Sequence, residues 1–151
     1  MKPIGLLVFI AVLFSACGKI EVFEKTKPFP QQEWKNSDMP SFTFNISDTA
    51  SRYNLYMVLR HTDAYRYKNI WVEIAVKAPD TVYNIKREFT LSDNTRWLGS
   101  AMDDIIEHRI NFNTVPVPLK KGDYTFTLKQ VMREDPLQYI LNAGVRVEKA
   151  K

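Results

Sequence analysis

Apolar and polar residues alternate along most of this chain, with the period of two that places successive side chains on opposite faces of a β-strand. The clearest run is 124–131, where Tyr124, Phe126 and Leu128 alternate with threonines and a lysine. Similar runs occupy 41–46, 53–60, 70–77, 82–91, 105–112 and 144–149, and the run at 105–112 is less regular than the others. Polar or proline-containing segments separate the runs, and each run has the length of one strand. The pattern therefore predicts an all-β protein.

Short turns join the predicted strands. Pro79 and Asp80 separate two runs closely enough for an antiparallel hairpin, and Gly122 begins another run after a turn. Residues 137–141 predict either a short helical turn or a corner between strands. Since no amphipathic run of three helical turns follows the first sixteen residues, we expect a single antiparallel β-sandwich, of Greek-key or jelly-roll type, over 41–151.

The first sixteen residues have the pattern of an export signal. Lys2 supplies a positive charge, residues 4–14 are apolar, and Ser15 and Ala16 are small. The apolar stretch is shorter than the about 20 residues that a membrane-spanning helix needs. We therefore expect residues 1–16 to be removed as a signal peptide.

Cys17 follows these small residues and is the single cysteine of the chain, so it has no disulfide partner within it. A thiol here fits a lipobox, in which the sulfur receives a diacylglyceryl group and the new N-terminus an acyl chain. The alternative is a chance thiol after an ordinary signal peptide. We favour lipidation, because two or three acyl chains hold a protein firmly at a bilayer when each buried methylene contributes about 0.8 kcal/mol.

The segment 17–40 is expected to be a lipidated N-terminus and extended tether. It mixes charges with prolines and leads towards a first edge strand, while Phe23, Phe29 and Trp34 indicate that part of it packs on the domain. Gly18 stands where an aspartate would favour retention in the inner membrane. We therefore expect an outer-membrane lipid anchor with the domain facing the periplasm.

Composition limits the classes of function. Hydrophobic residues make up 45% of the 151 residues and aromatic residues 13%, which is typical of one globular domain. The net charge is +4, but lysines and arginines are interspersed with acids. This distribution lacks the basic stripe that nucleic acids require, so no nucleic-acid partner is expected.

Catalytic and metal-binding patterns are weak. His61 and His108 are the two histidines; they lie in different segments without metal-ligand spacing, so surface or hydrogen-bonding roles are expected. Asp103 and Asp104 could be half of a calcium site, but a solvated loop is the simpler interpretation. We predict that the chain is not an enzyme, and that it binds no metal, no cofactor besides the lipid on Cys17, and no small-molecule substrate.

Aromatic and arginine side chains form the candidate interaction surface. The rings could stack on sugars, although core packing is the favoured interpretation. The arginines could be interface anchors or lie on a solvated strand face. The candidate residues are Arg60, Tyr65, Tyr67, Trp71, Trp97 and Arg133. Thr49 and Thr81 each lie in a short pattern typical of O-glycosylation in Bacteroidetes, which occurs readily by chance.

Several segments together are similar to a known family. They are Arg-His-Thr-Asp at 60–63, Tyr-Arg-Tyr-Lys-Asn-Ile-Trp at 65–71, Trp-Leu-Gly at 97–99, Gly-Asp-Tyr at 122–124 and Met-Arg-Glu-Asp-Pro-Leu at 132–137. The mature chain resembles the gliding-motility lipoprotein GldH family of Bacteroidetes, with departures at 94–96 and Val131.

The resemblance implies a non-catalytic envelope lipoprotein that acts as a component or assembly factor of the gliding-motility and type IX secretion machinery, with other envelope proteins as partners. The family has no established catalytic residues, so Cys17 is the one functional position carried over. The competing interpretation is a glycan-binding β-sandwich lipoprotein that uses Tyr65, Tyr67, Trp71 and Trp97.

Overall fold

Strands account for the regular structure of this protein. A computed structural model describes residues 21–151; the expected signal peptide and Cys17 lie outside the described residues. Within residues 21–151 there is no helix, so none is long and apolar enough to cross a membrane. The strands are β1 (Glu21–Pro28), β2 (Glu33–Trp34), β3 (Ser41–Ile46), β4 (Arg52–Thr62), β5 (Asn69–Lys77), β6 (Val82–Thr90), β7 (Ser100–Met102), β8 (Ile105–Asn111), β9 (Val117–Pro118), β10 (Gly122–Gln130), β11 (Leu137–Gln138) and β12 (Ile140–Lys149).

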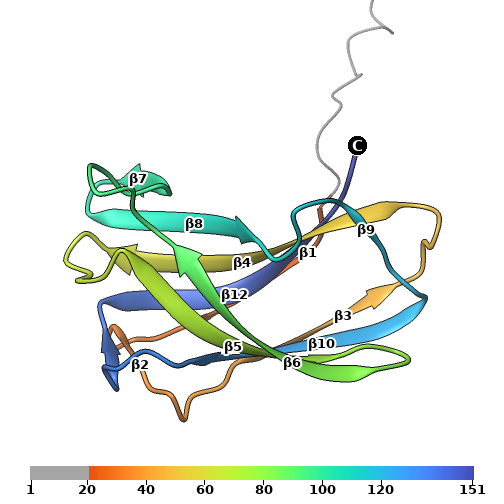
Figure 1. Cartoon of the computed structure of the whole chain (residues 1–151), viewed down its shortest axis with the longest axis horizontal. Coiled ribbons are helices and arrows are strands. Elements are labelled where there is room, and N and C mark those ends of the chain that lie inside the picture. Colours follow the sequence, from red (N-terminus) through yellow and green to blue (C-terminus); the bar gives the residue numbers. More distant parts are fainter. Residues whose placement is uncertain (1–20) are drawn as a thin grey trace, which may run out of the picture.

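The strands form two main antiparallel sheets that pack face to face (Figure 1). The first sheet has the order β1-β12-β4-β8-β7, and β9 pairs with the start of β4. The second sheet has the order β3-β10-β5-β6, while β2 and β11 form a small separate pair. The predicted all-β antiparallel sandwich is confirmed.

The hydrophobic core lies between the two sheets, where the apolar side of each alternating run is turned inward. The first sheet contributes Tyr53, Leu55, Met57, Leu59, Val145 and Val147. The second sheet contributes Phe42, Phe44, Val72, Ile74, Val76, Phe126 and Leu128. Burying each large apolar side chain contributes about 1.5–3 kcal/mol, so the period-two pattern is also what holds the sheets together.

The described part of the expected tether belongs to the sandwich, which corrects the boundary predicted at residue 40. Strand β1 pairs with β12 from Glu21 to Pro28, because β12 otherwise has an unpaired edge in the first sheet. Phe29 and Trp34 are buried and stack with ring centroids 5.4 Å apart. The packing predicted for these two aromatic residues is confirmed.

Three further details differ from the sequence pattern or complete it. Strand β12 begins at Ile140, where the pattern predicted 144. Residues 137–141 form a strand corner, with Tyr139 at a φ of 68° between β11 and β12. The short strands β7 and β9 were not predicted, because pairing with a neighbour defines them rather than alternation.

Gly144 allows β1 to lie close to β12. A Cβ atom at this position would lie 2.1 Å from the carbonyl oxygen of Lys25 and 2.6 Å from the Cα of Thr26. Both contacts are with backbone and are far shorter than van der Waals separation. The absence of a side chain at residue 144 is therefore a condition of the pairing of β1.

Candidate interaction surfaces

The six predicted interface residues lie in three places. Tyr65 and Trp97 join a buried cluster at one end of the sandwich. Tyr67, Trp71 and Arg133 line one surface groove, described below. Arg60 lies on the outer face of the first sheet, beside a separate pocket.

The buried cluster is built around two histidines. His61 on β4 and His108 on β8 are almost fully buried, and their Nε2 atoms are 2.9 Å apart. The Trp97 ring meets His61 edge-on at 4.5 Å, and the Tyr65 ring lies 5.0 Å from His61. The Tyr65 hydroxyl donates to the carbonyl of Asn69. Tyr65 is thus a core residue, as the core-packing interpretation expected.

The hydrogen bonds of the pair determine its tautomers. His61 Nδ1 lies 2.7 Å from the carbonyl oxygen of Thr62, which can only accept, so this nitrogen carries the proton. The unprotonated Nε2 of His61 then accepts from Nε2–H of His108. Both rings are neutral in this arrangement. Burial lowers the pKa of His61. Burial, together with the repulsion that a protonated His61 would exert, lowers the pKa of His108 to about 4.

A turn after β6 holds Trp97 over the pair. Asp93 accepts hydrogen bonds from the hydroxyl of Thr95 and from the amides of Thr95 and Arg96. These hydrogen bonds lower the pKa of Asp93 to about 2, and the bond from the Thr95 hydroxyl has the largest effect. Gly99 follows, and a Cβ there would lie 2.4 Å from the carbonyl oxygen of Glu107. The segment therefore packs directly on β8.

The sequence treated the two histidines as separate residues, and their contact was missed. Leu59 pairs with His108, and His61 pairs with Ile106, so the two rings are diagonal neighbours on the same inner face. A signal was present, because His61 continues the inward-facing positions of its strand. Only the β4–β8 register, however, brings together residues 47 positions apart.

A groove lies where the end of β10 passes the start of β5. It has a volume of about 490 Å³ and is lined by Tyr67, Asn69, Trp71, Met132 and Arg133. The Trp71 amide donates to the sulfur of Met132, which fixes the groove wall. Tryptophan, tyrosine, methionine and arginine are the residue types enriched at protein interfaces.

The rings of this groove do not form a flat stacking platform. Tyr67 is half-buried and meets Tyr65 at 69°, and no stacked pair joins Tyr67 to Trp71 among the described residues. The ammonium of Lys86 lies 5.4 Å from the centre of the Trp71 ring, so a cation already lies over that ring.

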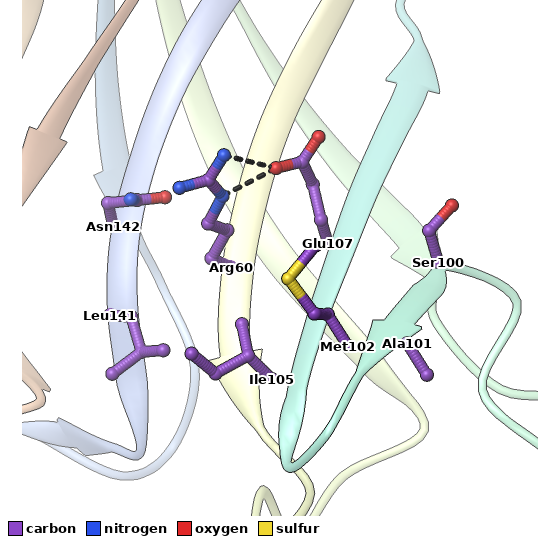
Figure 2. Close-up of a pocket in the computed structure, with 8 residues that line it drawn as sticks. All are labelled: Arg60, Ser100, Ala101, Met102, Ile105, Glu107, Leu141 and Asn142. Carbon is purple, nitrogen blue, oxygen red and sulfur yellow. Dashed lines mark hydrogen bonds and ion pairs between the residues drawn. The ribbon is translucent and has the colours of Figure 1, made fainter.

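A second pocket lies on the outer face of the first sheet (Figure 2). Its volume is about 330 Å³, and its lining residues are Arg60, Ser100, Ala101, Met102, Ile105, Glu107, Leu141 and Asn142. The Arg60 guanidinium binds the Glu107 carboxylate, while Met102 is 77% exposed. The side-chain oxygen of Asn142 is buried and has no hydrogen-bond partner. The pocket thus combines an apolar floor with a few polar groups.

Ion pairs continue from this pocket across the sheet. In order, they join Arg60 to Glu107, Glu107 to Arg109 at 3.2 Å, Arg109 to Glu24 at 3.7 Å, Glu24 to Arg146, and Arg146 to Glu148 at 2.6 Å. Arg146 and Glu148 are buried although they face outward. Because Glu24 belongs to β1, the ion pairs attach this edge strand to the rest of the sheet.

Metal ligands do not converge in the part of the chain that the structure describes, where no group of three or more histidines, cysteines or acids could hold an ion. Asp103 and Asp104 are exposed in the turn between β7 and β8. Thr49 and Thr81 are also exposed.

The fold and its grooves define an antiparallel β-sandwich whose candidate sites lie on its outer surfaces. Residues 21–147 match the model of a family described as GldH lipoprotein. The chain belongs to the GldH lipoprotein family, and the resemblance stated from its motifs is confirmed.

Two relatives match almost end to end. A protein of Christiangramia forsetii, named gliding motility lipoprotein GldH homolog, is 25% identical over 154 residues, covering 96% of this chain and 94% of its own length. The gliding motility lipoprotein GldH of Flavobacterium johnsoniae is 26% identical over 159 residues, covering 98% and 97%. Among solved structures, the subviral particle of infectious bursal disease virus VP2 has 12% identity and a TM-score of 0.34 over 87% of this chain and 32% of its own. So low a score supports no inference about this chain.

Proposed function

We propose that this protein is a lipid-anchored, non-catalytic component or assembly factor of the envelope machinery for gliding motility and type IX secretion. Membership in the GldH lipoprotein family carries the proposal, together with two full-length relatives whose names refer to gliding motility. The anchor is the diacylglyceryl and N-acyl lipid on Cys17. The site of action is the periplasmic face of the outer membrane.

Contacts with other envelope proteins are the proposed activity. The groove at Trp71 and the pocket at Arg60 offer aromatic, methionine and arginine side chains, which contribute most strongly to protein interfaces when they become buried. In contrast, the two histidines are buried, neutral and bonded to each other. They pack with Tyr65 and Trp97 at one end of the sandwich.

The experiment is complementation of a strain that lacks the gene, with colony spreading and protein secretion scored separately. Cys17→Ala should abolish complementation, because the domain leaves the membrane. Trp71→Ala should reduce complementation while the protein level is unchanged, and Thr43→Ala, on the exposed outer face of the second sheet, is the matched control. Pull-down of the wild-type protein should recover motility or secretion proteins, and recovery of none would contradict the proposal.

Glycan binding is the second candidate, because Tyr67 and Trp71 do share a groove. The missing coplanar platform and the cation over Trp71 support the protein-contact proposal instead. Measurable glycan affinity that Trp71→Ala removes, together with a pull-down empty of envelope proteins, would favour the second candidate.

A further inference from the structure

The short distance between the proposed lipid and the folded domain restricts how the domain can lie. This inference rests on the proposed lipidation of Cys17. The sandwich begins at Glu21, which already pairs with Glu148 in the first sheet. Cys17 and Glu21 are four positions apart, so their Cα atoms are separated by at most about 14 Å in any conformation. The start of β1 is therefore held within about 14 Å of the Cα atom of Cys17, the residue that carries the lipid.

The start of β1 lies at one particular end of the sandwich, which we name the proximal end. There, Tyr53 at the start of β4 pairs with both Lys149 at the end of β12 and Val117 of β9. The loops 47–51, 112–116 and 119–121 connect strands at this same end. Figure 1 shows the start of β1 close to the C-terminus and to β9.

The proximal end is rich in cations. Lys149 binds Asp48 at 2.7 Å, and Lys120 binds Asp80, so these four charges are mutually neutralised. Three further cations, Arg52, Lys121 and Lys151, are exposed and have no carboxylate within ion-pair distance among residues 21–151.

Exposed acidic and apolar residues also lie at this end, where Val82 at the start of β6 is 71% exposed. Asp123 is exposed and accepts a hydrogen bond from the side chain of Asn45 at 2.7 Å. Val115, at the tip of the loop between β8 and β9, is 64% exposed. Asn113 and Arg52 bind the backbone of this loop, through the carbonyls of Val115 and Pro116, so the tip is held in place.

We propose that the proximal end docks on an anionic phospholipid surface, with Val115 at the headgroup boundary and Arg52, Lys121 and Lys151 against lipid phosphates. The lipidated N-terminus keeps the domain near the bilayer, and the side chains of the proximal end determine which side of the domain faces it. Each cation near an anionic leaflet changes the ratio of docked to undocked protein by about fivefold. An apolar side chain beside these cations adds interfacial burial.

Docking in this way places the opposite end, with the Trp71 groove, away from the membrane. Strand β4 runs between the ends over 11 residues, which corresponds to about 36 Å at the rise of a strand. Tyr67 and Met102 would then face the periplasm, where protein partners can reach them.

The test uses the acylated protein in vesicles of phosphatidylethanolamine and phosphatidylglycerol. Because the Cys17 thiol is consumed by the lipid, Val115→Cys introduces a single reactive thiol for an environment-sensitive fluorophore. Met102→Cys is the matched control, since residue 102 is 77% exposed, against 64% for residue 115, but lies at the opposite end. Lipids with a quencher in the acyl chain should quench the label at residue 115 at least threefold more than the label at residue 102. Equal quenching of the two labels would overturn the proposal.

A charge variant tests the phosphate contacts. The double variant Lys121→Gln with Lys151→Gln should lower the ratio of docked to undocked protein about 25-fold and so remove most of the quenching at residue 115. Lys35→Gln with Lys68→Gln removes two exposed charges away from the proximal end and should leave the quenching unchanged. Undiminished quenching in the first double variant would overturn the proposal.

Mass spectrometry separates this inference from the proposed function. An unmodified Cys17 thiol would refute the lipid anchor itself. An acylated Cys17 with a water-exposed label at residue 115 would refute only the docking.

Discussion

The buried pair His61 and His108 should make the stability of the sandwich depend on pH between about 5 and 7. In the folded protein, burial lowers the pKa of His108 to about 4 and also lowers the pKa of His61. In the unfolded chain both return to about 6.5. The unfolded chain therefore binds more protons as the pH falls through 6.5. The free energy of unfolding therefore has its full value above about pH 7 and decreases as the pH falls below it.

The magnitude follows from the two pKa values of one ring. With about 4 in the folded state and about 6.5 in the unfolded state, His108 alone lowers the free energy of unfolding by about 2 kcal/mol between pH 8 and pH 5. The shift at His61 acts in the same direction. Asp93, with its pKa lowered to about 2, titrates well below this window.

Urea denaturation at pH 8, 6 and 5, followed by tryptophan fluorescence, measures the effect. The control is the double variant His61→Leu with His108→Leu, which replaces both partners by apolar residues and leaves no unpaired nitrogen. Its stability should vary by less than about 1 kcal/mol over the same range. Equal stability of the wild-type protein at pH 8 and pH 5, or an undiminished loss in the double variant, would refute the argument from a neutral buried pair.

Other variants test the first sheet and the groove. Gly144→Ala should lower the free energy of unfolding by about 3 kcal/mol, because the new Cβ meets the backbone of Lys25; a loss under about 1 kcal/mol would show that β1 adjusts freely. Arg146→Ala should cost about 3 kcal/mol, because it leaves buried carboxylates unpaired, whereas Arg60→Ala, at a half-exposed pair, should cost under about 1 kcal/mol; equal costs in denaturation would contradict this contrast. Trp71→Ala should leave the free energy of unfolding within about 1 kcal/mol of the wild-type value while reducing recovery of partners in a pull-down, and unchanged recovery would exclude the groove as the contact.

Much of the fold could be predicted, because its main strands have one apolar side. The runs at 41–46 and 70–77 agree with β3 and β5, and in both strands the inward residues are the ones that alternate as apolar. Strand β1 could not be recognised in the same way. Its residues are mixed in polarity, and it is a strand because β12 offers it an unpaired edge.

The structure groups the candidate interaction residues differently from their order in the sequence. Tyr67, Trp71 and Arg133 do share a groove, although Arg133 is more than sixty residues from Trp71 in the chain. Tyr65 was grouped with them by its neighbourhood in sequence, yet it lies in the core beside His61. Tyr65 and Tyr67 are two positions apart and would lie on the same side of a strand. They lie instead in the loop between β4 and β5, where the period of two does not apply, so one ring is in the core and the other in the groove.

The sequence by itself determined the strand-forming segments, the proposed lipid site and the family. These depend on local features: the period of two, the residues around Cys17, and motifs such as Arg-His-Thr. The tertiary structure decided the pairing of β1 and the contact of His61 with His108. Both depend on which strands become neighbours and in which register. A register is selected by the packing of the whole core, so residues far apart in the chain meet only once that core has formed.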